Sequence, residues 1–131
     1  MNLNNFSNFN IDKRGNLLSV ELEKFKLFKV KRFFLISFKN KNIRGNHAHK
    51  KCKQFFLCLK GKVKIVLKNK LKKKTIILNS NFKRGLFVEP RTWNILIPMT
   101  KKCEVLCLCD RSYSKTDYIF DIIEFKKKYC L

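Results

Sequence analysis

The sequence predicts an all-β protein, a sandwich or barrel of roughly nine short strands, and three patterns support this fold class. Short apolar runs alternate with turn signals along most of the 131 residues. The chain has no internal repeat and no glycine-rich phosphate-binding loop. Helical spacing of apolar residues occurs only near the C-terminus. Because 45% of the residues are hydrophobic and 13 are Phe, the chain can bury a core, and we expect one domain spanning residues 1–131.

The first part of the chain is predicted to form strands on both sides of a polar turn. Residues 1–10 are rich in Asn and form either a loose segment or an edge strand. The turn lies at Asp12–Asn16, where Gly15 supplies unusual backbone angles. Leu17–Leu22 alternates as a strand does. Phe25–Phe38 is predicted to be one long strand whose second half is buried on both faces.

The rest of the chain continues the pattern of short apolar runs. The predicted strands are Gln54–Leu59, Lys62–Leu67, Thr75–Leu78, Gly85–Pro90, Asn94–Pro98 and Glu104–Cys109. Lysines between residues 68 and 74 mark a hairpin tip, where their charges discourage edge-to-edge pairing. The one predicted helix, Thr116–Tyr129, has an approximate apolar face made of Tyr118, Ile119, Ile122, Ile123 and Phe125.

The formal charge of +22 raises the question of a nucleic-acid partner, because basic domains bind phosphate backbones. The lysines are scattered along the chain, however, and the aromatic residues lie within apolar strands and not between arginines on one face. No base-stacking platform can therefore be recognised. We expect no nucleic-acid partner, and we expect the positive field to attract an anionic small molecule.

The cysteines and the hydropathy pattern predict a cytoplasmic protein. None of the six cysteines forms a CxxC pair, which favours reduced structural thiols in a reducing compartment. No apolar run reaches the roughly 18 residues needed to span a membrane, and the N-terminal residues do not resemble a signal peptide.

The two histidines, His47 and His49, are the best candidates for a chemical centre. Residues at positions i and i+2 of a strand share a face, so the two imidazoles are expected to project side by side. Three interpretations are open. A metal site would lack the usual third protein ligand. In acid–base catalysis, His49 would take a proton from a carbon next to a carbonyl, and Arg44 would neutralise a phosphate. In the third interpretation both histidines are structural.

Five motifs, in order along the chain, narrow these interpretations. They are Asp12–Leu17 (D-x-R-G-x-L), Phe28–Phe34 (a Lys-Arg pair leading into a strand), Arg44–Lys50 (R-G-x-H-A-H-K, followed by Gln54 and Gly61), Pro90–Trp93 (P-x-x-W) and Asp117–Asp121 (D-Y-I-x-D). Together they resemble the sugar 3,4-ketoisomerases of the cupin superfamily, which act on dTDP-4-keto-6-deoxyglucose.

The resemblance implies a cupin double-stranded β-helix, or jelly-roll barrel, with a short C-terminal helix. It also implies a homodimer that exchanges N-terminal strands and uses no metal or other cofactor. The implied reaction moves the carbonyl from C4 to C3 of the nucleotide-linked hexose through an enediol. The product would supply the synthesis of a 3-amino-3,6-dideoxyhexose for surface glycans.

Carried over to this chain, the family motifs assign roles to particular residues. His49 becomes the favoured base, and His47 would polarise the sugar oxygens or relay a proton to them. Arg44 and Arg32 become candidates for the pyrophosphate or the sugar, and Arg14 for the nucleotide. Trp93 is assigned either to the substrate site or to the core.

The chain departs from the family pattern in the strand before the histidines. The family commonly carries tyrosines there, one of which assists catalysis, whereas this chain has Phe33–Ser37. Ser37 or a water molecule would then substitute for the phenol. Lys53 also stands where a glutamate is usual. The departures keep two rival hypotheses open: a non-catalytic cupin-like module that binds a nucleotide or sugar, and a metal-dependent oxygenase.

Overall fold

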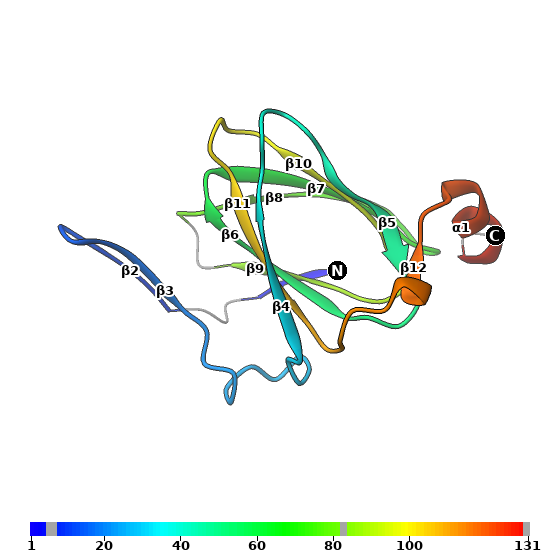
Figure 1. The fold of residues 1–131 in the computed structure, drawn as a ribbon, viewed down its shortest axis with the longest axis horizontal. Helices are drawn as coiled ribbons and strands as arrows, with labels where there is room; N and C mark the ends of the chain where they lie inside the picture. Colours follow the sequence, from blue (N-terminus) through cyan, green and yellow to red (C-terminus); the bar gives the residue numbers. More distant parts are fainter. Residues whose placement is uncertain (5–7, 82–83, 130–131) are drawn as a thin grey trace.

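Two antiparallel sheets form the body of the protein in a computed structural model that describes residues 1–4, 8–81 and 84–129 (Figure 1). The first sheet has the strand order β1-β9-β6-β11-β4. Its strands are β1 (Asn2–Asn4), β9 (Gly85–Val88), β6 (Gln54–Lys60), β11 (Glu104–Cys109) and β4 (Arg32–Ser37). The second sheet has the order β12-β5-β10-β7-β8. Its strands are β12 (Tyr118–Ile119), β5 (Arg44–His49), β10 (Trp93–Pro98), β7 (Lys62–Lys68) and β8 (Lys73–Asn79).

Three further elements lie outside the two sheets. Strands β2 (Asn8–Asp12) and β3 (Gly15–Ser19) form a hairpin that extends away from the body, and helix α1 (Ile122–Tyr129) lies at the opposite end of the molecule (Figure 1). A short 3₁₀ turn, Lys115–Asp117, precedes β12. The turn between β2 and β3 is where the sequence predicts it, and Gly15 adopts a φ of 126° there.

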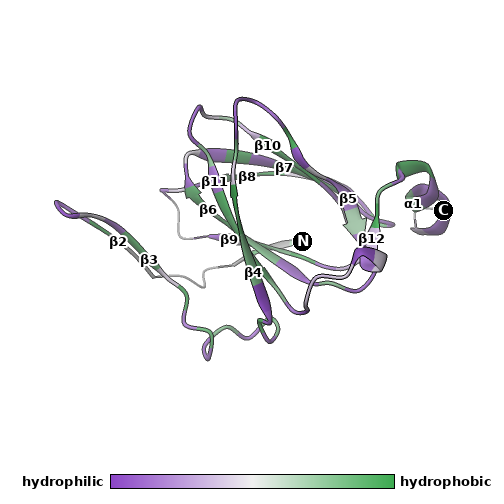
Figure 2. Ribbon diagram, viewed as in Figure 1, coloured by the Kyte–Doolittle hydropathy of each residue, from purple (hydrophilic) through white to green (hydrophobic). Residues whose placement is uncertain are grey.

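The core lies between the inward faces of the two sheets. Alternate residues of β7, namely Val63, Ile65 and Leu67, are fully buried, while the residues between them, Lys64 and Val66, are partly exposed. Figure 2 shows hydrophobic and hydrophilic colour alternating along strands such as β7, and mostly hydrophilic colour in the loops at the top of the view. This alternation is what the sequence predicts, and the all-β class with a short C-terminal helix is confirmed.

Each sheet also has a covered outer face. Residues of the segment that follows β3 cover the first sheet, where the ring of Phe25 packs edge-on against Phe28 and Phe55 at 5.0 and 5.1 Å. Helix α1 covers the second sheet, and its buried Phe125 lies 5.5 Å from the ring of Trp93. Because these outer faces are covered, the inward faces of the strands remain available for a site inside the barrel.

The prediction of one long strand over Phe25–Phe38 is wrong in its first half. A turn in which the N–H groups of Lys24 and Phe25 donate to the carbonyl of Glu21 redirects the chain, and β4 begins only at Arg32. The second half is not buried on both faces either, since Phe33 and Leu35 are 70% and 54% exposed. The reason is that β4 is an edge strand whose outer face has little cover within this chain.

The prediction of a helix over Thr116–Tyr129 is also wrong in its first half. Tyr118 and Ile119 pair with β5 instead, and α1 starts after Asp121. The carboxylate of Asp121 accepts hydrogen bonds from the N–H groups of Ile123 and Glu124, as a helix N-cap does. Tertiary pairing with β5 therefore overrides the helical spacing of these two apolar residues.

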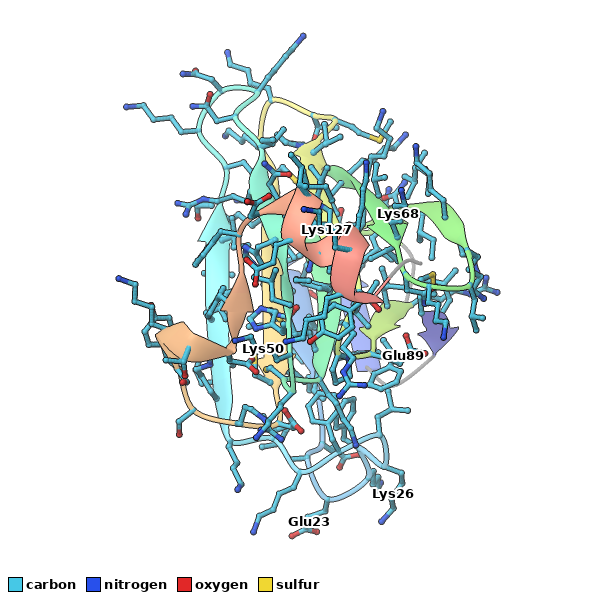
Figure 3. The ribbon with its side chains drawn as sticks, turned by 90° about the vertical axis from the view of Figure 1, so that its right-hand side faces the viewer. Glu23, Lys26, Lys50, Lys68, Glu89 and Lys127 are labelled. Atoms are coloured by element: carbon cyan, nitrogen blue, oxygen red, sulfur yellow. The ribbon has the colours of Figure 1, made fainter. Side chains whose placement is uncertain are left out.

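The positive charge is spread over the surface of the body. Figure 3 shows lysine side chains pointing outward from several elements, among them Lys68 and Lys127 near α1 and Lys26 at the other end of this view. Among the described residues, no helix is long and apolar enough to cross a membrane.

Candidate active site

A cavity of about 320 Å³ opens between β4 of the first sheet and β5, β10 and β12 of the second. Its wall combines polar side chains with a few apolar ones. The lining residues are Arg32, Phe34, Leu35, Ile36, Ser37, Arg44, Gly45, His47, Gln54, Phe56, Asn94, Leu96 and Tyr118. A space of this size suits a small polar ligand.

A bulge in β5 shapes the part of the wall that carries the histidines. Gly45 and Asn46 have φ values of 76° and 59°, and the pairing with β10 shifts register at this point. A Cβ atom on Gly45 would lie 2.7 Å from Oδ1 of Asn94, so only glycine lets the two strands approach here. After the bulge, His47 and His49 share one face, and their ring centroids are 5.1 Å apart.

His49 is buried and anchored by a carboxylate from a distant part of the chain. Its Nδ1 lies 3.0 Å from Oδ2 of Asp117, and both side chains are almost inaccessible to solvent. Asp117 also accepts hydrogen bonds from the N–H groups of Lys51 and Cys52, at 2.8 and 3.3 Å. The carboxylate therefore holds the proton on Nδ1. Nε2 of His49 is buried and has no partner among the described residues, which leaves its lone pair free to take a proton.

The two imidazoles differ electrostatically although they are neighbours. Burial, together with the neighbouring His49, lowers the pKa of His47 to about 4. Burial also lowers the pKa of His49, but the Asp117 carboxylate acts in the opposite direction. Burial alone would raise the pKa of Asp117, and the hydrogen bonds from His49 and the backbone more than offset it, so that this pKa is lowered. Both histidines are thus neutral, and Asp117 is ionised, at neutral pH.

Aromatic rings and a guanidinium complete the wall. The ring of Tyr118 lies 4.3 Å from that of His49 and 5.0 Å from that of His47. Arg32 reaches the same region from the opposite sheet, where its Nη2 lies 3.6 Å from Sγ of Cys109 and its guanidinium stacks at 5.7 Å on Tyr113. Nε of Arg32 is buried without a partner among the described residues, and so is Nδ2 of Asn94.

One group of potential metal ligands, formed by His49, Cys52 and Asp117, lies beside the cavity with its ligand atoms within 4.8 Å of one another. The donor set does not fit a divalent cation well. Asp117 already accepts three hydrogen bonds, one of which engages His49. The neighbouring Cys109 and burial raise the pKa of Cys52 well above its ordinary value, so its thiol stays protonated. The arrangement fits a histidine–aspartate pair better than a metal centre.

The described cysteines are all buried free thiols: Cys52, Cys58, Cys103, Cys107 and Cys109. This agrees with the structural thiols expected from their spacing, while Cys130 lies outside the described residues.

The structure brings most of the predicted site residues together. His47, Arg32, Arg44 and Ser37 line the cavity, and the ring of His49, which is not part of the lining, contacts that of His47. Trp93 lies away from it in the cluster beneath α1. Arg14, by contrast, lies on the projecting hairpin, where its exposed guanidinium pairs with the carboxylate of Asp12 at 2.7 Å.

Sequence reasoning missed three residues of this site. The sequence pattern places Asp117 and Tyr118 in the predicted helix and gives them no role beyond the D-Y-I-x-D motif. Asn94 was assigned to a strand without a role. The motif that carries Asp117 and Tyr118 was the available signal, since a motif shared with a family of enzymes could have marked them as part of the site.

Comparison with known proteins identifies the family. The family described as WxcM-like, C-terminal (FdtA) matches residues 1–129. The chain belongs to this family. The TDP-4-oxo-6-deoxy-alpha-D-glucose-3,4-oxoisomerase of Aneurinibacillus thermoaerophilus is 35% identical over 118 residues, which cover 89% of this chain and 84% of that relative.

Solved structures of sugar 3,4-ketoisomerases share the fold. QdtA of Thermoanaerobacterium thermosaccharolyticum, in complex with TDP, aligns with a TM-score of 0.85 and 34% identity, covering 97% of this chain and 92% of QdtA. A 3,4-ketoisomerase from Helicobacter canadensis aligns with a TM-score of 0.82 and 32% identity, covering 96% and 94% of the two chains. A mutant of QdtA in complex with TDP-4-keto-6-deoxyglucose gives a TM-score of 0.82 at 35% identity, covering 97% of this chain and 94% of the mutant. The resemblance inferred from the five motifs, including the cupin-type fold, is confirmed.

Proposed function

We propose that this protein is a TDP-sugar 3,4-ketoisomerase that converts TDP-4-keto-6-deoxyglucose (TDP being the nucleotide also written dTDP) into a TDP-3-keto-6-deoxyhexose. The observation that carries the proposal is the state of His49. Its Nδ1 is held by Asp117, and its Nε2 has no partner among the described residues. Its ring lies against His47 and Tyr118, which line a cavity together with cationic and neutral polar groups. Proton transfer between neighbouring carbons is the chemistry that such a base performs.

The reaction needs two proton transfers at carbon. His49 removes the proton from C3, next to the C4 carbonyl, and the electron pair of the C3–H bond forms the enediol. The same imidazole then returns a proton to C4, which leaves the carbonyl at C3. Every step is a proton transfer, so we propose that no metal or other cofactor takes part.

His49 is a better base than His47, although His47 lies closer to the cavity. The pKa of His47 is lowered to about 4, which makes it a weak proton acceptor at neutral pH. His49 keeps the support of Asp117, which stabilises the imidazolium formed when the proton arrives. We therefore assign His47 to hydrogen bonding with the sugar oxygens.

The arginines are suited to the anionic part of the substrate. Arg44 is exposed and lines the cavity from β5, where its guanidinium can form paired hydrogen bonds with a pyrophosphate. Arg32 lies deeper and can stabilise charge on a sugar oxygen. Ser37, at the end of β4, is a further candidate contact. Trp93 has no place in the proposed substrate site, because it packs beneath α1.

We further propose a homodimer with exchanged N-terminal strands. The β2–β3 hairpin projects from the body (Figure 1). It carries the exposed apolar residues Ile11 and Leu17. The outer face of β4 exposes Phe33 and Leu35. Two copies could cover these faces mutually, and the hairpin would bring Arg14 toward the nucleotide of the partner's site. Sedimentation analysis is expected to give twice the chain mass, and Leu35→Glu is expected to shift it toward the monomer. A wild-type monomer at micromolar concentration contradicts the exchange.

The proposed place of the reaction is the cytoplasm, since the five described cysteines remain free thiols as in reducing compartments. We propose that the 3-keto product is consumed in the synthesis of a 3-amino-3,6-dideoxyhexose.

The test of the proposed function is incubation of the purified protein with TDP-4-keto-6-deoxyglucose in heavy water. We expect formation of the 3-keto isomer and incorporation of deuterium at C3 or C4, measured by NMR. Saturable binding of TDP without either change would instead favour a non-catalytic nucleotide-binding module.

A further inference from the structure

The ring of Tyr118 is the part of the cavity wall closest to the proposed base. Strand β12 pairs with β5 so that Tyr118 lies opposite His49 in register. Its ring contacts both imidazoles, at centroid distances of 4.3 Å to His49 and 5.0 Å to His47. On its other side, Phe120 stacks on it at 5.3 Å with nearly parallel planes. Three neighbouring rings thus fix the position of the Tyr118 ring.

The phenol of Tyr118 faces a cation from the opposite sheet. The Arg32 guanidinium, from β4, lines the same cavity and interacts electrostatically with the phenol. The phenol O–H is a donor that can serve an oxygen of a bound sugar. Burial raises the pKa of Tyr118 and Arg32 partly counteracts it, so the group stays protonated at neutral pH but its phenolate would have a cation beside it. Its other titratable neighbours are His47, His49, Tyr113 and Cys109.

The proposed isomerisation leaves a task that His49 alone does not perform. When the base removes the C3 proton, negative charge grows on O4, and O4 must gain a proton while O3 must later lose one. Among the described lining residues, His47 has a pKa of about 4 and is therefore neutral at neutral pH, so it has no imidazolium proton to donate. The arginines do not release protons at neutral pH. Ser37 is a weak acid at the exposed end of β4. Tyr118 is therefore the best placed acid on this wall.

We propose that the Tyr118 hydroxyl is the catalytic acid and base at the sugar oxygens, an inference that rests on the proposed function. As His49 takes the proton from C3, the electron pair forms the C3–C4 double bond, and O4 receives the proton of Tyr118. The phenolate, held by Arg32, then takes the proton from O3 while His49 returns its proton to C4. The C3 carbonyl forms, and both residues regain their starting states.

The test compares Tyr118→Phe with Tyr129→Phe, a matched variant of a tyrosine that packs against Phe125 of α1 and does not line the cavity. For Tyr118→Phe we expect kcat to fall about 100-fold or more, since acid–base groups contribute about 10²- to 10⁴-fold. We expect TDP to bind within threefold of the wild type. Deuterium should also enter C3 of recovered substrate more often per product formed, because an enediolate without a proton on O4 returns to substrate. Tyr129→Phe should keep wild-type turnover.

The outcomes separate this inference from the proposed function. The role of Tyr118 is overturned if Tyr118→Phe turns over within threefold of the wild type, or if its ratio of deuterium exchange at C3 to product formation is unchanged. In either case, turnover by the wild-type protein still supports the proposed function. A wild-type protein without turnover overturns both. If Tyr118→Phe does not fold, difluorotyrosine at position 118 keeps the ring and lowers the phenol pKa. The alkaline limb of the pH–rate profile should then move to lower pH, and an unmoved limb overturns the role.

Discussion

The interior of the barrel has two halves that obey the same strand alternation but contain different chemistry. In the half built by β7 and β8, the inward positions carry Val63, Ile65, Leu67, Ile76 and Leu78, all buried. In the half built by β4, β5 and β12, inward positions carry His47, His49, Tyr118 and Arg32. Both halves belong to the same barrel interior, and they differ in the side chains at their inward positions.

The two halves differ in whether they contain buried polar atoms without hydrogen-bond partners. The apolar half buries side chains that favour folding by about 25 cal/mol per Å² removed from water. The site half contains Arg32 Nε and His49 Nε2, which are buried without partners among the described residues, as is Asn94 Nδ2 on the neighbouring strand β10. An unpartnered buried polar group costs roughly 1–3 kcal/mol. The apolar half therefore stabilises the barrel, and this stability offsets the cost of the unpartnered polar atoms that the site half offers to a ligand.

The largest expected effect tests the site half alone. We expect His49→Asn to reduce kcat about 10³-fold, because it removes the proposed base, while TDP binding and thermal stability stay near the wild-type values. Turnover assays, calorimetric TDP titration and thermal unfolding measure the three quantities. Retained turnover in this variant, with loss of turnover in His47→Asn, would assign the base to His47.

The next effect tests the apolar half alone. Ile65→Ala should lower the free energy of unfolding by about 3 kcal/mol, because it leaves a cavity at a fully buried position. Denaturant unfolding measures this change, and kcat should stay close to the wild type at temperatures where the variant is folded. Ile77→Ala is the matched control, since Ile77 is half exposed on β8. A large loss of kcat in folded Ile65→Ala would show that the two halves are not separable.

The smallest effect concerns the link between His49 and the distant Asp117. Asp117→Asn should reduce kcat about 10- to 100-fold, part of what a general base contributes. His49 must be neutral to accept a proton, so activity is lost as the pH falls through its pKa. The carboxylate raises this pKa against the effect of burial. Its removal should therefore move the acid limb of the pH–rate profile to lower pH.

Two controls separate an electrostatic role of Asp117 from a merely structural one. Asp121→Asn alters a nearby carboxylate at the start of α1, where Asn caps a helix as well as Asp does. It should leave both kcat and the acid limb unchanged. An Asp117→Asn variant with reduced kcat but an unmoved acid limb would contradict the orienting and charge-stabilising role.

Part of the site could be predicted from the sequence because it depends on neighbouring residues. The two-residue period of a strand places His47 and His49 on one face, and it needs no knowledge of the fold. The turn at Gly15 and the buried alternation of β7 are local in the same sense. The five motifs then identified the family, which the family match over residues 1–129 confirms.

The rest was decided by contacts between residues far apart in the chain. His49 and Asp117 are separated by 68 positions, and their hydrogen bond exists only because β12 pairs with β5. The same pairing turns Tyr118 from a residue of a predicted helix into a wall of the cavity, opposite Arg32. The sequence by itself determined the all-β class and the paired histidines, because side-chain period and turn chemistry act locally. Only the tertiary structure decided which carboxylate and which phenol meet them, because strand pairing depends on the packing of the whole core.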